Sequence, residues 1–490
     1  MRRPVCADAA RRHGDDRDER EREHREQCQG RPIRVREPPA HRRTRVPQTN
    51  AGFPENTLQT LSPTLVRIAR SLLPLVGVAA PFIALVRMVL WSVNVPYSDE
   101  WDWTVLAAAL RSGTLHWAGV WAPHNGHREL VANVMFVAFD RLGGWNVVRE
   151  ELAGLACAIV GLIALHRLLH RSMNALAADA AFAIGAWLIA GPIAFESFLT
   201  GSNVGWPLAA GAMLIAADRL CAPARSPRDV ALAAGAALIA SFTLAPGLII
   251  WPCGLVVLLG TRAPLRTTAA WCGVSAAAFA VYFTGYAGDP ATAQLRARSF
   301  GDAFRYALVF LGTPLRSAEM SLHVLEAIGA AIVLAFVAAA ITALRSAGER
   351  ERTWPWIGLG AYALGGAVVT SYTRAGMGEP QAMSPRYVSV SAFLLLAVVA
   401  MLLPRALALR TVASRSAAAF AAVVLLFLLA RSEKLGSTLW RDYDYHRGVA
   451  VQGLARNDAA TFWESYPDPV RLEQYLDILR SVDDGPLDEK

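Results

Sequence analysis

The sequence has almost no lysine and few charges of any kind. Lys434 and Lys490 are the only lysines in 490 residues, and charged residues make up only 18% of the chain. Hydrophobic residues make up 54%, and the mean hydropathy is +0.31. Such a composition is too apolar for a soluble protein of this length and is typical of a polytopic membrane protein.

The sequence also lacks paired cysteines. Its six cysteines include no CxxC pair, and four of them lie in or beside apolar segments, where a thiol behaves as a small hydrophobic group. We therefore expect neither a cysteine metal site nor a disulfide framework. The net charge of +8 comes almost wholly from arginine in the amino-terminal region and in loops between apolar runs. Because membrane orientation requires such arginines, no nucleic-acid partner is expected.

Residues 1–60 mix dense charges with prolines and hold few apolar side chains. Such a segment cannot bury enough surface to fold alone, so we expect a disordered, arginine-rich cytoplasmic tail. The alternative is upstream sequence included by a wrong start codon. No cleavable signal sequence is expected, because the first apolar stretch is too long and too far from the amino terminus.

Eleven apolar runs are expected to cross the membrane, which takes roughly 17 to 25 residues per helix. They are 72–94, 151–169, 173–195, 204–220, 228–244, 247–261, 267–286, 324–345, 355–373, 387–403 and 415–432. The fold class that we expect is therefore an all-α polytopic membrane protein with about 11 transmembrane helices.

The segment 129–145 decides the orientation of the chain. It is apolar but short, and Asp140 and Arg141 precede a Gly-Gly break. If it does not cross, five basic connections share one face with the arginine-rich tail, as the positive-inside rule requires. They are 166–171, 218–228, 261–266, 345–352 and 404–410. We therefore expect 129–145 to be an interfacial or re-entrant helix, with a cytoplasmic amino terminus and an outer carboxyl terminus.

This orientation predicts three parts. They are the tail 1–60, a transmembrane domain 61–432 and a small outer cap 433–490. The long first outer loop, 95–150, opens with PYSDEWDW directly after the first apolar run. It is expected to hold a short amphipathic helix at about 102–111 and interfacial tryptophans. Two helices are expected in the cap, near 446–465 and 469–482, and the cap either covers the site or serves as a docking surface.

Ionisable side chains gather on the predicted outer face. The acidic candidates are Asp99, Glu100 and Asp102 in DEWD, with Glu196 as a supporting residue in FESFLTGSN. The candidates for substrate or phosphate binding are His124, Asn125, His127 and Arg128 in HNGHR, Arg374 in RAGMG, and Arg386 and Tyr387 in SPRY. Ionisable groups at a membrane edge are functional candidates by default.

The residue types indicate a chemistry. Arginine presents a planar, permanently charged fork that holds a phosphodiester or pyrophosphate bidentately. The arginines expected to do so are Arg128, Arg374 and Arg386, with Arg296 and Arg298 as further candidates. Carboxylates that face such groups form a site for proton abstraction beside an anionic leaving group.

Each cluster also has a structural alternative. The DEWD stretch can be a solvated loop with aromatic anchors, and Arg386 can be an interfacial arginine that snorkels. His124 and His127 are expected in headgroup contacts or hydrogen bonds rather than on a metal, because HxxH lacks the i, i+4 spacing of a helical zinc pair. A divalent cation, Mg²⁺ or Mn²⁺, held by Asp99 and Glu100 is retained as an alternative.

The many predicted spans, the Asp-Glu pair that opens the first outer loop, and the arginines on later outer loops resemble the GT-C superfamily. These integral-membrane glycosyltransferases use polyprenyl-phosphate-linked sugars. The resemblance covers roughly 70–430 and implies that Asp99 is the catalytic carboxylate, with Glu100 second. GT-C members often add a sizeable outer domain, whereas about 58 residues follow the last apolar run here. Acceptor recognition is therefore left to loops.

The resemblance also implies an inverting transfer at the outer face of a bacterial plasma membrane, in the cell envelope. Asp99 would take the proton of an acceptor hydroxyl, and arginines and histidines would stabilise the departing lipid phosphate. Glu100 or Asp102 would orient the base or hold an ion. The implied partners are the polyprenyl-phosphate sugar donor, a glycan or lipid acceptor, and the bilayer. The polyprenyl chain would lie along the small-residue segments 207–216 and 231–240, which otherwise serve as packing faces.

Two other classes of function compete with this hypothesis. A transporter or flippase of a lipid-linked or anionic solute would carry ionisable groups deep in its spans, inverted repeats and broken helices in matching halves. The sequence shows no internal repeat, and its polar residues crowd one face. A non-catalytic polymer-assembly subunit would tolerate neutralisation of DEWD without loss of function.

Overall fold

The computed structural model of the 490-residue chain describes residues 62–286, 290–346, 348–456 and 468–481. The predicted tail 1–60 lies outside these residues. The α-helices are α2 (Pro63–Trp91), α3 (Thr104–Arg111), α4 (Trp117–Trp121), α5 (Leu130–Gly143), α6 (Val147–Ser172), α7 (Ala175–Ala190), α8 (Gly205–Leu220), α9 (Pro227–Ser241), α10 (Ile250–Gly260), α11 (Leu265–Phe283), α12 (Pro290–Ala293), α13 (Phe300–Gly312), α14 (Leu322–Arg345), α15 (Arg350–Arg374), α16 (Val388–Leu407), α17 (Val412–Arg456) and α18 (Pro469–Ser481). Short 3₁₀ helices are η2 (Ser98–Trp103), η3 (Pro192–Phe198), η4 (Gly201–Val204), η5 (Ala245–Ile249), η6 (Thr313–Leu315), η7 (Ala375–Met377), η8 (Glu379–Met383) and η9 (Pro385–Tyr387).

The described part of the chain is an all-α membrane protein, as the composition predicts. Its strands are β1 (Pro123–His124) and β2 (His127–Arg128), which form one small hairpin. Each of the eleven predicted runs overlaps a helix. By length and composition, five helices in the described residues can cross a membrane, or six if α7 and η3, bent by 48°, form one broken span. The count of eleven spans stays a prediction.

Helix α5 corresponds to the segment that decides the orientation. It has 14 residues and is therefore about 21 Å long, shorter than the roughly 30 Å hydrocarbon core of a bilayer. Helix α3 lies where the short amphipathic helix of the first loop is predicted. The start of the predicted cap helix 446–465 is not separate from the last span, because α17 continues from Val412 to Arg456 without interruption, and 457–465 lies outside the described residues.

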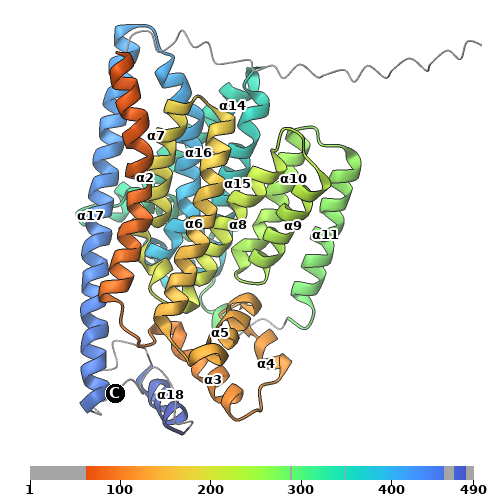
Figure 1. Cartoon of the computed structure of the whole chain (residues 1–490), viewed down its shortest axis with the longest axis vertical. Coiled ribbons are helices and arrows are strands. Elements are labelled where there is room, and N and C mark those ends of the chain that lie inside the picture. Colours follow the sequence, from red (N-terminus) through yellow and green to blue (C-terminus); the bar gives the residue numbers. More distant parts are fainter. Residues whose placement is uncertain (1–61, 287–289, 347, 457–467, 482–490) are drawn as a thin grey trace, which may run out of the picture. The chain divides into compact units, whose positions relative to one another are not determined.

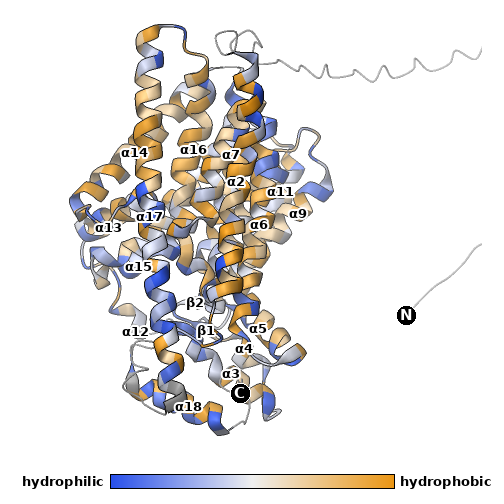
Figure 2. Cartoon of the chain, turned by 60° about the vertical axis from the view of Figure 1, so that its left-hand side comes forward, coloured by the Kyte–Doolittle hydropathy of each residue, from blue (hydrophilic) through white to orange (hydrophobic). Residues whose placement is uncertain are grey.

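Long helices form the membrane-embedded bundle because a lipid-exposed backbone must satisfy its hydrogen bonds within its own segment. Helix α16 lies inside the bundle, with 89% of its most apolar window buried, whereas the corresponding fraction for α17 is 6%. Helices α2, α14 and α17 present large apolar side chains outward, including Leu75, Leu334 and Phe420. Figure 2, coloured by hydropathy, shows α2 and α14 as mainly hydrophobic helices.

Small residues allow close helix packing in the centre of the bundle. Helix α6 packs on α8, and a Cβ added at Gly161 would lie 2.7 Å from the Cα of Gly211. The small-residue segment 207–216 is therefore a packing face on α6, and not the lipid groove that we considered for it. A separate apolar groove lies between α2, α7, α16 and α17, with an empty volume of about 1750 Å³.

One end of the bundle carries a second, smaller core. Figure 1 shows α3, α4, α5 and α18 together at this end. Trp101, Trp103 and Phe136 pack there with Leu472 and Leu476 of α18. The carboxyl-terminal helix thus packs directly on the loop that follows α2. This end holds most of the residues predicted to be functional.

Candidate functional site: a charged cleft at one end of the bundle

The HNGHR stretch forms the hairpin β1–β2. Asn125 and Gly126 both have positive φ, at 47° and 79°, as a two-residue type I′ turn requires, and Asn-Gly is the favoured pair for such a turn. The register places His124 directly opposite His127. The two imidazoles are therefore neighbours across the hairpin, a placement that the sequence analysis did not predict.

The DEWD stretch forms the 3₁₀ helix η2, which separates its three carboxylates. Residues three apart eclipse one another in a 3₁₀ helix, so Asp99 and Asp102 lie on one side of η2 while Glu100 points elsewhere. Asp99 lines the cleft described below, together with Arg386. The three acidic residues, adjacent in the sequence, thus have different surroundings.

Glu100 is a buried structural residue. Its Oε1 accepts a hydrogen bond from the Gly201 amide at 2.6 Å, and its Oε2 accepts one from the Tyr97 amide at 3.2 Å. The side chain is fully buried and does not line the cleft. Burial raises the pKa of Glu100 to about 7, with the nearby carboxyl of Glu151 adding to the shift. Because both of its oxygens hold backbone amides, we assign Glu100 a structural role, and its role as a second catalytic carboxylate stays a prediction.

Asp102 connects the first loop to α18. Its carboxylate accepts a hydrogen bond from the Tyr475 hydroxyl, and Arg471 Nη2 lies 3.5 Å from its Oδ1. His124 Nε2 lies 3.4 Å from its Oδ2. His124 also contacts the Asn125 amide and does not line the cleft. The pair Asp102 and His124 therefore supports the hairpin and the carboxyl-terminal helix.

A cleft with an empty volume of about 650 Å³ collects the remaining candidates. Six of the predicted residues line it, from four separate parts of the chain. The ionisable and polar lining consists of Asp99, Asn125, His127, Glu129, Ser202, Asn203, Thr370, Thr373, Arg374, Arg386 and Tyr387, with Trp206 among the apolar lining residues. A smaller recess of about 270 Å³, also lined by Asp99 and Arg386, adjoins it and reaches Glu196 and Tyr443.

Two guanidinium groups are fixed in the cleft with donors to spare. Arg386 Nη1 lies 3.0 Å from Glu196 Oε1, and Glu196 Oε2 also accepts bonds from the Arg386 amide and the Ser384 hydroxyl. Arg374 Nη2 donates to the Asn125 carbonyl at 3.0 Å. Each guanidinium has five N–H donors, so both can still bind an anion in the cleft. Glu196 thus positions Arg386, and its supporting role in the site stays a prediction.

Arg128 does not belong to the cleft. Its guanidinium is buried and donates to the carbonyls of Tyr282, Trp121 and Thr284 at 2.7, 2.8 and 2.6 Å. It also lies over the Trp121 ring at 4.4 Å. Because backbone carbonyls occupy its fork, we assign Arg128 a structural role, and phosphate binding by Arg128 stays a prediction. Arg296 and Arg298 are exposed and do not line the cleft either.

His127 and Glu129 both lie in the cleft in forms without charge. Burial lowers the pKa of His127 to about 3, and the neighbouring Arg374 adds to the shift. Its buried Nδ1 has no hydrogen-bond partner among the residues that the structure describes. Burial also raises the pKa of Glu129 well above its usual value, with Asp99 and Asp102 adding to the effect and Arg386 opposing it. The cleft therefore holds an imidazole and a carboxyl that both favour their neutral forms.

Glu129 is the main residue that the sequence analysis missed. It directly follows HNGHR and precedes the apolar segment of α5, where a lone glutamate reads as a helix N-terminal residue. Only the hairpin turn and the packing of α5 bring it opposite Asp99 and Arg386. Trp206 was also missed; its ring lies 5.2 Å from that of Tyr387 and adds an aromatic wall.

The proposed divalent cation at Asp99 and Glu100 does not fit these contacts, because Glu100 is buried and holds two amides. In the part of the chain that the structure describes, one group of three side chains has the spacing of a metal site, and it lies elsewhere, at His166, His170 and Asp179. The transfer proposed for the cleft therefore uses no metal ion.

Comparison with known protein families gave no match. No curated protein matched the sequence either. Among solved structures, the chain is similar to ArnT from Cupriavidus metallidurans bound to undecaprenyl phosphate, with a TM-score of 0.44 and 18% identity over 84% of this chain and 76% of that chain. For ArnT in the apo state the TM-score is 0.39 and the identity 16%, with the same coverage. Since both TM-scores are below 0.5, we base the function on the residues of this chain.

Proposed function

We propose that this protein is a membrane glycosyltransferase that moves a sugar from a polyprenyl-phosphate donor to an acceptor hydroxyl. The observation that carries the proposal is the cleft in which Asp99 and Glu129 face Arg374 and Arg386. A carboxylate base beside two guanidiniums suits the transfer of a group away from a phosphate.

Asp99 is the proposed base. The acceptor oxygen attacks the anomeric carbon of the donor sugar and gives its proton to the Asp99 carboxylate. As the new bond between carbon and oxygen forms, the bond from the anomeric carbon to the phosphate oxygen breaks, and the electron pair leaves with the lipid phosphate. Attack from the face opposite the leaving group inverts the configuration of the sugar.

The phosphate is proposed to lie between Arg374 and Arg386. The contact of Arg386 with Glu196 and that of Arg374 with the Asn125 carbonyl fix both groups before the substrate binds. A preorganised donor stabilises developing charge without reorganisation. His127 is neutral beside them, so it can donate one hydrogen bond without adding charge.

The apolar groove between α2, α7, α16 and α17 is the proposed place for the polyprenyl chain. It is lined almost entirely by aliphatic side chains, and Glu433 lies at one end. Glu433 accepts a hydrogen bond from the Ile193 amide in η3, and the same short helix carries Glu196, the partner of Arg386. The element η3 thus links the end of the groove to the phosphate-binding arginine.

The first experiment compares Asp99→Asn with Glu100→Gln in cells that express correctly inserted protein. Both changes remove one carboxylate from η2, but only Asp99 lines the cleft. We expect Asp99→Asn to lower transfer by about 10²- to 10⁴-fold, as loss of a general base does, and to raise the pool of polyprenyl-phosphate sugar. Glu100→Gln should retain transfer.

The alternatives give different results in the same experiment. A transporter or a non-catalytic assembly subunit would leave the lipid-linked sugar pools of Asp99→Asn unchanged while the protein remains folded. That result would overturn the proposal. We propose that the chain is oriented in the membrane with the cleft outside the cell. The acceptor is then a glycan or lipid on the outer side of the membrane.

A further inference from the structure

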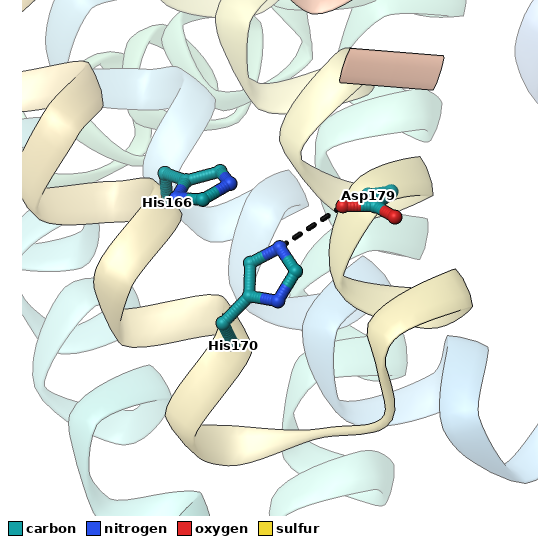
Figure 3. Close-up of side chains that lie close together, drawn as sticks. All are labelled: His166, His170 and Asp179. Carbon is teal, nitrogen blue, oxygen red and sulfur yellow. Dashed lines mark hydrogen bonds and ion pairs between the residues drawn. The ribbon is translucent and has the colours of Figure 1, made fainter. Parts of the chain in front are cut away.

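A second polar cluster lies far from the cleft. Helix α6 carries His166 and His170 one turn apart, and Asp179 projects toward them from α7 (Figure 3). The cleft end of α6 carries Glu150, and 16 residues at 1.5 Å each separate it from His166, about 24 Å along the helix. The cluster therefore belongs to the opposite end of the bundle and takes no part in the chemistry proposed for the cleft.

We propose that His166, His170 and Asp179 bind a divalent transition-metal ion, with Zn²⁺ as the best fit. Spacing of i and i+4 places both imidazoles on one face of α6, as a helical zinc pair requires. The potential ligand atoms of the three side chains all lie within 4.8 Å of one another. In a tetrahedral zinc site, ligand atoms about 2.0 to 2.1 Å from the metal lie about 3.3 Å apart, so small side-chain rotations close the site.

The surroundings favour metal binding over a simple ion pair. His170 Nε2 lies 2.9 Å from Asp179 Oδ1, so two ligands are already converged. The His166 ring lies tilted by 42° against His170, with centroids 4.3 Å apart, and meets Phe182 edge-on at 5.2 Å. Among the described residues, His166 has these ring contacts and no hydrogen bond that would explain its place beside a second imidazole.

Charge and access also suit an incoming cation. Asp179 is nearly buried, while the His170 side chain is 33% exposed and leaves an entry path. The neighbouring arginines of α6, Arg171 and Arg167, form ion pairs with Asp218, at 2.6 and 3.8 Å, rather than with Asp179. Three protein ligands leave a fourth position for water. The ion would join α6 to α7 across the turn at Met173 and Asn174.

Zinc binding can be measured on the full-length protein, purified in detergent without a histidine tag and stripped with a chelator. We expect one Zn²⁺ per chain in equilibrium dialysis, and visible absorption bands of tetrahedral Co²⁺ in the cobalt-loaded protein. His166→Gln and His170→Gln should each weaken Zn²⁺ binding at least 10-fold and abolish the cobalt bands. Asp179→Asn keeps an oxygen acceptor for His170 but removes the charge, and should also weaken binding at least 10-fold.

Two control variants separate this site from other histidines. His323→Gln alters an exposed histidine beside Glu326, and a triple His13, His24 and His41 to Gln variant removes the tail imidazoles. Both should keep the bound zinc and the cobalt bands. Melting temperatures of the metal-free variants should match that of the wild type, which excludes misfolding as the cause. If the His166→Gln, His170→Gln double variant binds as much Zn²⁺ as the wild type, the proposal is overturned and the cluster is an ion pair.

Discussion

At the scale of single residues, Glu129 makes the sharpest prediction. The folded protein holds the proton of Glu129 more tightly than the unfolded chain does, since burial raises its pKa well above its usual value. Above the ordinary glutamate pKa of about 4.3, the unfolded chain releases this proton while the folded protein retains it. Raising the pH therefore destabilises the fold through Glu129. Glu129→Gln should remove this effect and should be more stable than the wild type at pH 7 to 8, but not at about pH 4.

Thermal melting in detergent over this pH range checks the prediction. The control is Glu319→Gln, since Glu319 is exposed and its pKa is lowered, mainly by a hydrogen bond from Arg431. For this group, the contribution to stability is lost as the pH falls, so its variant should show the opposite dependence. Equal pH dependence of wild type and Glu129→Gln would show that Glu129 ionises as freely in the folded protein as in the unfolded chain.

Arg386 and Arg128 illustrate how one residue type takes two roles. Arg386→Ala should abolish transfer while leaving the melting temperature close to that of the wild type, because the side chain borders the cleft. Arg128→Ala should instead lower the melting temperature strongly. It leaves three carbonyls without donors, and each such loss is worth about 1 to 3 kcal/mol.

Both quantities are measured on the same purified variants. Arg386→Lys serves as the matched control. Lysine keeps the positive charge but lacks the planar guanidinium group that contacts Glu196. If Arg128→Ala melts like the wild type and loses only transfer, then Arg128 reaches the phosphate and its contacts with carbonyls are incidental.

At the scale of elements, η2 is held by a residue that the sequence suggested as catalytic. Glu100 joins the start of η2 to η4 through the Tyr97 and Gly201 amides. Glu100→Gln keeps an acceptor for Gly201 and should retain transfer and fold. Glu100→Ala leaves the amides of Tyr97 and Gly201 unpaired and should destabilise the protein by about 2 to 6 kcal/mol, at about 1 to 3 kcal/mol for each amide. Transfer that falls as far in Glu100→Gln as in Asp99→Asn would return Glu100 to the catalytic group.

The positions of the helices could be predicted from the sequence. Apolar runs located a helix at every expected span, since a long apolar run in lipid has few alternatives to a helix. Side-chain direction could not be predicted in the same way. Whether Asp99 or Glu100 faces the cleft depends on the 3₁₀ turn of η2 and on Gly201, about a hundred residues away in the chain. Asp102 depends on Tyr475, which lies still farther along.

The hairpin β1–β2 also has one feature that could be predicted from the sequence and one that could not. Asn125 and Gly126 are a local signal for a type I′ turn, so the pairing of His124 with His127 was readable from the sequence. The sequence does not reveal which of the two histidines enters the cleft. That choice depends on the contact of His124 with Asp102 and on that of Arg374 with the Asn125 carbonyl.

At the scale of the whole molecule, the charged cleft and the His166 cluster lie at opposite ends of the bundle. Helix α8 begins at Gly205, next to the cleft residue Trp206, and runs 16 residues, about 24 Å, to Leu220. The connection after it holds Ala224 and Arg225, with Arg219 in the last turn of α8 and Arg228 near the start of α9. By the positive-inside rule we propose that this connection is cytoplasmic and that the cleft lies outside.

Single cysteines at the two ends test this orientation, after the six natural cysteines have been replaced by serine or alanine. Ser112 is exposed after α3 at the cleft end, and Ala224 is exposed at the other end. In intact cells, a maleimide that cannot cross membranes should label Ser112→Cys, whereas Ala224→Cys should react only after permeabilisation. The reverse pattern would place Asp99, Arg374 and Arg386 in the cytoplasm. A donor whose sugar and phosphate lie on the outer side of the membrane would then be excluded. Its phosphate could not reach Arg374 and Arg386 on the cytoplasmic side.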